Sequence, residues 1–144
     1  MTILASTFVQ RQARLFHAGA FDEMVRAYAF PLPVEQDGAV VVYSDPAQYQ
    51  GALALIRATL LAGGMTGLCG RLAARELTRD ARFRVWVSLD LIYADRIDLA
   101  AVRFVHYCRQ TAEGIQVEMV EMLHNPAETS FCPVVPPVER RTSA

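Results

Sequence analysis

The chain has 144 residues, of which 53% are hydrophobic, so it is long enough for one domain with a single core and too short for two ordinary domains. Its 14 basic and 15 acidic side chains give a net charge of -1, which supplies no long-range attraction to nucleic acid or to an anionic membrane. Three cysteines without a CxxC pair (Cys69, Cys108 and Cys132) disfavour a disulfide framework and a zinc site, and we expect a soluble cytoplasmic protein.

Two helices are predicted in the first 30 residues. The first starts at a cap formed by Ser6 or Thr7 and ends at Gly19. A second, short helix starts at Ala20, and Pro31 stops it because the proline ring removes a hydrogen-bond donor and clashes with the preceding turn. The first helix should therefore be amphipathic, with its polar residues largely on the side away from the apolar stripe: Gln10, Arg11, Gln12 and Arg14.

A β-hairpin and a third helix follow. Residues 32–34 are predicted to form an edge strand because a proline within them cannot donate to a central ladder, and residues 37–38, Asp-Gly, form the turn into a strand at 39–43. Asp45 as N-cap and Pro46 at the first helical position indicate the start of the third helix, which ends at a Gly-Gly pair. An inward-facing apolar stripe is expected on that helix.

The second half of the chain changes from helical to two-residue periodicity. The alternation predicts an antiparallel meander of four long strands, at residues 67–78, 82–93, 99–110 and 115–124. Helices followed by long strands predict an α+β fold in which N-terminal helices pack inside a strongly curved antiparallel sheet, a cone-shaped half-barrel. We expect residues 1–124 to form a single domain and the proline-rich residues 125–144 to form an extended tail.

The alternation also divides the meander into two faces. One face is apolar except for His106 and Glu121, which lie on adjacent strands and are predicted to be neighbours. Burying either residue without a partner costs about 1–3 kcal/mol or more, so a pair is favoured. This pair is either an acid–base dyad, in which Glu121 orients His106, or a packing solution at the base of the pocket.

The opposite face mixes charged and aromatic residues, a composition typical of interfaces. We predict a homodimer contact through this outer sheet face, formed by Trp86, Arg103, Tyr107 and Glu118. The alternative is a solvated face on which charged residues form ordinary cross-strand pairs.

Three sequence stretches accompany this order of elements: FHAGAFDEMVRAY, DPAQYQGALALI and VRFVHYCRQTAEGIQVEMVEM. Over about residues 6–124 the chain resembles the nuclear transport factor 2-like superfamily, or cystatin-like cone, which includes ketosteroid isomerases, polyketide cyclases and scytalone dehydratase. The resemblance implies a curved sheet folded round helices, with a conical and mostly apolar pocket, commonly in a dimer.

The isomerase branch offers a residue-by-residue comparison. HAGAFD matches its turn, which puts Gln12 where that branch has an oxyanion-hole tyrosine, and VEQD puts Gln36 where it has the catalytic base. His106 falls at the position of the second, acidic oxyanion donor. A neutral amide cannot abstract a carbon-bound proton, so the isomerase mechanism does not carry over unless a one-residue shift brings Glu35 or Asp37 into place.

Three functions are compatible with these features. The first is binding of a small apolar molecule, without a metal or cofactor, by residues that the pattern or the resemblance places in the pocket: Gln12, Tyr28, Gln36, Leu91, Phe104, Cys108 and Met119. The second is an isomerase, cyclase or lyase that uses His106 and Glu121. The third is a non-catalytic protein-interaction subunit. A cavity of roughly 300 Å³ or more would favour a ligand, and a filled cone would favour the subunit.

Overall fold

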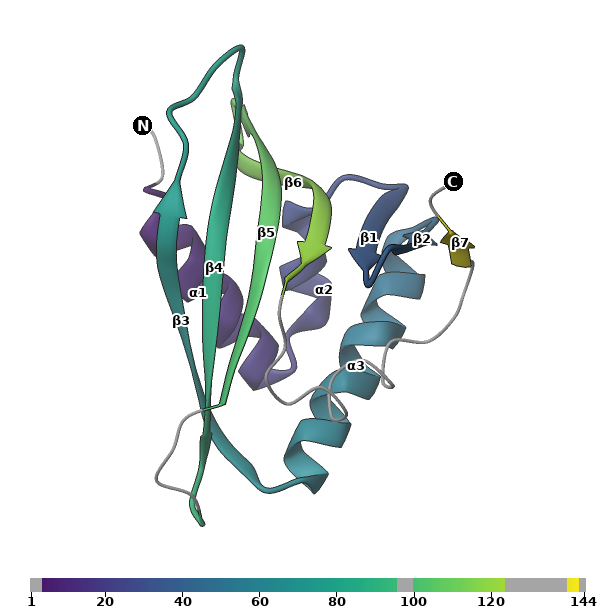
Figure 1. The fold of residues 1–144 in the computed structure, drawn as a ribbon, viewed down its shortest axis with the longest axis vertical. Coiled ribbons are helices and arrows are strands. Elements are labelled where there is room, and N and C mark those ends of the chain that lie inside the picture. Colours follow the sequence, from purple (N-terminus) through teal and green to yellow (C-terminus); the bar gives the residue numbers. More distant parts are fainter. Residues whose placement is uncertain (1–3, 96–99, 124–139, 143–144) are drawn as a thin grey trace.

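The computed structural model describes residues 4–95, 100–123 and 140–142 (Figure 1). The helices are α1 (Ala5–Ala18), α2 (Phe21–Met24) and α3 (Pro46–Ala62), with a 3₁₀ turn at Val25–Ala27. The strands are β1 (Leu32–Gln36), β2 (Ala39–Tyr43), β3 (Met65–Arg75), β4 (Arg82–Tyr93), β5 (Ala100–Thr111), β6 (Gly114–Met122) and β7 (Arg140–Thr142).

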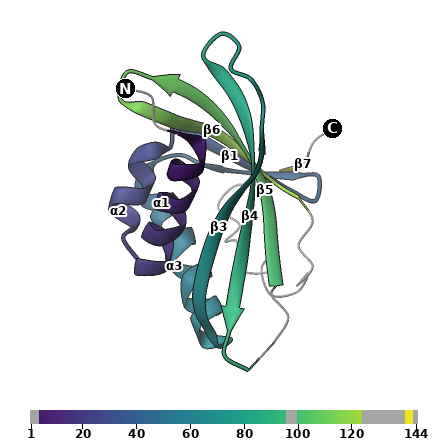
Figure 2. The same ribbon diagram turned by 90° about the vertical axis from the view of Figure 1, so that its left-hand side faces the viewer.

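The strands of the described residues form one sheet in the order β3-β4-β5-β6-β1-β2-β7. All neighbours are antiparallel except β1 and β6, which are parallel. Figure 2 shows the sheet curving, with α1, α2 and α3 on one side of it. The α+β prediction, with helices packed against a curved antiparallel sheet, is confirmed in this arrangement.

The first strand is not an edge strand, contrary to the prediction. β1 lies between β2 and β6, and its pairing with β6 involves Val34 and Glu35 only. Pro33 therefore precedes the parallel ladder, where its missing N–H is not needed, and a central position becomes possible. The predicted hairpin turn is present, with positive φ at Asp37 (51°) and Gly38 (78°), as a tight turn between twisted strands requires.

The start of α3 and the end of α1 have the predicted capping residue, and the start of α1 does not. Asp45 caps α3, and its carboxylate accepts a hydrogen bond of 2.9 Å from the backbone N–H of Gln48. Gly19 ends α1 in the left-handed conformation. The cap predicted at Ser6 or Thr7 is wrong, because α1 begins earlier, at Ala5, and has no side-chain cap.

The core lies between the helices and the concave face of the sheet. The inward residues of β4 alternate as predicted, and most are buried: Phe83, Val85, Val87, Leu91 and Tyr93. The segment predicted as a tail falls largely outside the described residues. Its part at Arg140–Thr142 forms β7 and pairs with β2 at Ala39–Val41.

Candidate functional site

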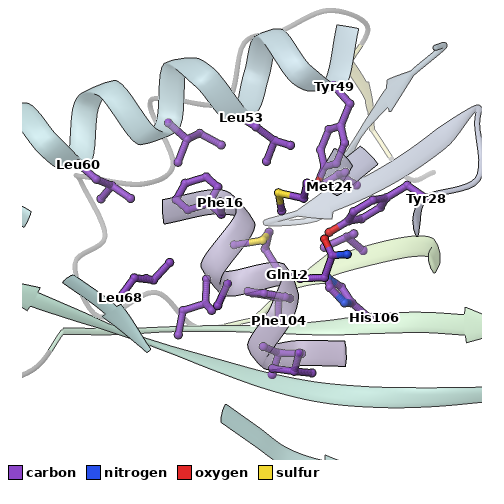
Figure 3. A pocket seen from close by; sticks show the side chains of 18 of the residues that line it. Gln12, Phe16, Met24, Tyr28, Tyr49, Leu53, Leu60, Leu68, Phe104 and His106 are labelled. Carbon is purple, nitrogen blue, oxygen red and sulfur yellow. The ribbon is translucent and has the colours of Figure 1, made fainter. Parts of the chain in front are cut away.

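A cavity of about 100 Å³ lies between the helices and the concave face of the sheet (Figure 3). The volume has room for several water-sized groups or about one ring, and is smaller than the roughly 300 Å³ of a pocket for a drug-sized ligand. Helix α1 supplies Val9, Gln12, Ala13 and Phe16, and α3 supplies Tyr49, Leu53, Ile56 and Leu60. The sheet contributes the other wall, including Leu68, Leu91, Phe104, His106, Val120 and Met122.

The cavity wall is apolar except for one end. No Asp, Glu, Lys or Arg is among the described residues that line it. At the polar end, Gln12, Tyr28 and His106 point toward one another from α1, the segment after the 3₁₀ turn, and β5 (Figure 3). An ionised ligand group would find no opposite charge here, which favours an uncharged ligand.

Buried polar atoms at this end lack partners. Gln12 is 4% exposed and His106 is 5% exposed. Within the described part of the chain, the Oε1 and Nε2 atoms of Gln12 and the Nδ1 atom of His106 are buried without a hydrogen-bond partner. Most buried polar side-chain atoms in proteins are satisfied, so three atoms without a protein partner beside one cavity mark a position where a ligand or water can form hydrogen bonds.

His106 is a neutral residue packed among rings. Burial lowers the pKa of its imidazole from 6.5 to about 3, because the charged form loses its hydration. Its ring centroid lies 4.8 Å from that of Phe104 and 5.9 Å from that of Tyr28, the latter in an edge-to-face arrangement. The imidazole can therefore donate or accept a hydrogen bond at neutral pH, but it is a weak base.

Three tyrosines close the same side of the cavity. The Tyr49 and Tyr28 hydroxyls are hydrogen-bonded to each other. The centroid of the Tyr49 ring lies 5.0 Å from that of Tyr28 and 5.1 Å from that of Tyr43. Burial raises the pKa of Tyr43 to about 12, and burial also raises the pKa of Tyr28 and of Tyr49 well above the ordinary phenol value. All three phenols therefore stay neutral at physiological pH.

The predicted pairing of His106 with Glu121 is wrong. In the pairing of β5 with β6, Tyr107 is opposite Met119 and Cys108 is opposite Val117. The residue of β6 between Val117 and Met119 therefore has no partner of its own in β5 and forms a β-bulge. The bulge reverses the alternation of faces for the rest of β6. Val120 therefore lies opposite His106 on the inner side.

Glu121 consequently lies on the outer side of the sheet. Its Oε1 atom accepts a 2.7 Å hydrogen bond from the Tyr107 hydroxyl. The same reversal moves Met119 away from the cavity. No acid–base pair of the predicted kind exists at the site.

The remaining predicted ligand residues divide into two groups. Gln12, Tyr28, Leu91 and Phe104 line the cavity. Gln36, at the end of β1, and Cys108 do not line it. Cys108 is buried, its thiol donates to the His106 carbonyl at 3.6 Å, and burial raises its pKa to about 12, so it acts as a small core residue.

The comparisons with known proteins agree with this architecture. No protein-family model matches the sequence, and none of the curated proteins is similar to it. A nuclear transport factor 2-like protein of unknown function from Shewanella oneidensis superposes with a TM-score of 0.61 and 13% identity, over 81% of this chain and 93% of that chain. The chain has the nuclear transport factor 2-like fold.

Other proteins with the nuclear transport factor 2-like fold differ in function. The β subunit of benzoate 1,2-dioxygenase from Burkholderia mallei superposes with a TM-score of 0.60 and 12% identity, over 90% of this chain and 95% of that chain. A proposed scytalone dehydratase from Novosphingobium aromaticivorans superposes with a TM-score of 0.55 and 7% identity, over 81% of this chain and 78% of that chain. The fold thus occurs in a subunit of an enzyme and in a proposed enzyme, and does not by itself assign a function.

Sequence reasoning missed several residues of the nuclear transport factor 2-like cavity. Regular alternation along β6 would put Val120 and Met122 on the outer face, and the bulge turns them to the inner one. The burial of Gln12 had a sequence signal: it lies four residues from both Phe8 and Phe16, so all three share one side of α1. Tyr49 and Leu53 belong to the predicted apolar stripe of α3, but that stripe does not distinguish a cavity wall from a filled core.

The outer sheet face carries contacts within one chain. Arg84 lies 5.1 Å above the half-buried Trp86 ring, and Glu118 accepts a 3.0 Å hydrogen bond from Arg82. Arg71 forms a 2.8 Å ion pair with Asp90. Exposed pairs of this kind contribute about 1 kcal/mol or less each. Such pairs are compatible with the alternative of a solvated face. They do not test the homodimer predicted through Trp86, Arg103, Tyr107 and Glu118, which stays a prediction.

Two further properties bound the chemistry. Among the residues that the structure describes, no three His, Cys, Asp or Glu side chains gather where they could hold a metal ion. No helix in the described ranges has the length and apolarity needed to cross a membrane.

Proposed function

We propose that the protein binds a small, uncharged, mainly apolar molecule in its conical cavity. The observation that carries this proposal is an apolar cavity with unpartnered buried polar atoms, from Gln12 and His106, at one end. The apolar wall would bind the body of the ligand through burial of its surface, and the polar end would orient it.

An isomerase, cyclase or lyase has weaker support. A general base works best when its pKa is near the operating pH, and the pKa of His106 is lowered to about 3 by burial. Glu121 is bonded to Tyr107 on the other side of the sheet and cannot orient His106. His106 could still polarise a ligand oxygen through a hydrogen bond, which contributes to binding without abstracting a proton.

Leu53→Phe is expected to fill part of the cavity and to abolish binding of a one-ring probe. Leu53 is buried and points into the cavity from α3, whereas Leu55, two residues along the same helix, is 48% exposed (Figure 3). Toluene should raise the melting temperature of the unmodified protein, because a ligand that binds only the folded state stabilises it. The matched control Leu55→Phe should show the same rise, and Leu53→Phe little or none.

Two outcomes would contradict the ligand-binding proposal. One is a melting temperature of the unmodified protein that neither toluene nor a polar one-ring compound of similar size changes at concentrations near its solubility. The other is an equal rise in Leu53→Phe and Leu55→Phe, which would locate toluene outside the cavity.

We also propose that the protein forms a homodimer through the outer sheet face. Trp86 is a large, partly exposed aromatic residue near the middle of β4, the type of residue that contributes most to interfaces. Trp86→Glu would replace an apolar ring with a charge that must lose its hydration at such a contact, and should convert dimers to monomers in sedimentation experiments. Trp86→Phe keeps an apolar ring and should leave the dimer intact. A monomeric unmodified protein, or a dimeric Trp86→Glu variant, would remove this assignment.

A further inference from the structure

We infer that the ligand has a flat edge carrying adjacent N–H and C=O groups, as a cyclic amide does, and that Gln12 binds both groups at once. This inference rests on the proposed function, because it concerns the same cavity. It goes further by naming the chemical class of the polar end.

The unusual feature of Gln12 is that its whole carboxamide is available. The residue is 4% exposed, and neither Oε1 nor Nε2 has a partner, so one buried acceptor and one buried donor group lie side by side. Both belong to a side chain fixed on α1 between Phe8 and Phe16, two buried residues of the same helix side. The carboxamide faces the polar end of the cavity together with Tyr28 and His106 (Figure 3).

A carboxamide selects for a particular partner. Its oxygen and nitrogen can form two parallel hydrogen bonds only with a group that presents a donor and an acceptor at matching spacing, as glutamine does on the edge of a base. A ring ketone or ether would leave Oε1 unpaired. A carboxylate would leave Oε1 unpaired as well and would bring a charge into a wall without an opposite charge.

The surroundings of Gln12 favour a single flat ring. The cavity holds about 100 Å³, and Phe16, Tyr28 and Phe104 line it. The unpartnered Nδ1 atom of His106 offers a third hydrogen bond near the same edge. A one-ring cyclic amide matches the volume, the rings and the polar atoms together, whereas water would satisfy only the polar atoms.

The test compares 2-pyridone, which has the cyclic-amide edge, with toluene, which has a ring of similar size without polar groups. Isothermal titration gives the ratio of the two association constants, and comparing ratios between variants cancels the hydration of the probes. Gln12→Met, which keeps an unbranched chain but removes both amide atoms, should lower the 2-pyridone to toluene ratio at least about tenfold, as expected for two hydrogen bonds. The control Gln10→Met, on the exposed side of α1, should leave the ratio unchanged.

Each outcome decides between the inference and the proposed function. A ratio that Gln12→Met does not lower would overturn the cyclic-amide inference. Binding of toluene without binding of 2-pyridone would overturn it as well, while leaving ligand binding in the cavity intact. If neither probe binds the unmodified protein, both the inference and the proposed function are wrong. Circular dichroism of Gln12→Met would establish that the comparison is made on a folded protein.

Discussion

Replacing His106 with leucine is expected to make folding much less sensitive to acid. The pKa of His106 is about 3 in the folded state, because of burial, and near 6.5 when the imidazole is hydrated in the unfolded chain. Between these values the unfolded state binds the extra proton, so the free energy of unfolding falls as the pH is lowered from about 6.5 toward 3. The full slope for one proton is about 1.4 kcal/mol per pH unit. The stabilising contribution is fully present above pH 6.5.

The groups around His106 offer no compensation in this range. Tyr28, Phe104 and Gln12 face it, and the raised pKa of Tyr28 keeps that phenol neutral. Cys108, two residues away on the same strand, is also neutral because burial raises its pKa to about 12. No carboxylate is among the described residues lining the cavity. The imidazolium would therefore have no counter-charge inside.

Urea unfolding at pH 4, 5 and 7 measures this effect. Other groups also make the free energy of unfolding depend on pH. The informative quantity is therefore the difference in the free energy of unfolding between the unmodified protein and His106→Leu. This difference should change by about 1.4 kcal/mol for each pH unit below 6. Phe104→Leu removes a ring that contacts His106 without removing a titrating group, and should lower stability by a similar amount at every pH. Parallel pH curves for unmodified protein and His106→Leu would show that the imidazole is not buried as described.

Local chemistry in the sequence was sufficient for most of the fold. The Asp-Gly turn has few alternative conformations, and Asp45 with Pro46 specifies a helix start through a hydrogen bond and a fixed φ. The predicted strand at residues 82–93 coincides with β4 (Arg82–Tyr93) because its alternation is long and regular. Such signals act within a few residues, so they do not depend on knowledge of tertiary contacts.

The site was less predictable because it depends on register between strands. The bulge in β6 adds one residue and inverts the faces of Met119, Val120 and Glu121. A trace in the sequence is the pair of consecutive apolar residues at 119–120, where a regular strand would alternate. The resemblance to the isomerase branch predicted that Gln12 lies at the pocket. The polarity pattern of its helix predicted the opposite, because polar residues usually face solvent and Gln12 is buried.

Gly70→Ala is expected to destabilise the fold by about 1–3 kcal/mol, because it overpacks the contact between α1 and β3. A Cβ atom at Gly70 would lie 2.7 Å from the Cβ atom of Ala13 and 3.1 Å from the carbonyl oxygen of Val9. One of these is a main-chain atom and the other a first side-chain atom, so no rotamer change can move either. The helix and the sheet must therefore separate locally.

Gly51→Ala provides the matched control for this substitution. A Cβ atom at Gly51 would meet nothing within 4 Å, and alanine is favoured over glycine inside a helix, so stability should rise by about 0.5–1 kcal/mol. Urea unfolding of both variants measures the difference, and a Gly70→Ala protein as stable as the unmodified one would contradict the close packing. Since Ala13 and Gln12 are adjacent on α1 and both line the cavity, Gly70→Ala should also weaken binding of 2-pyridone more than Gly51→Ala does.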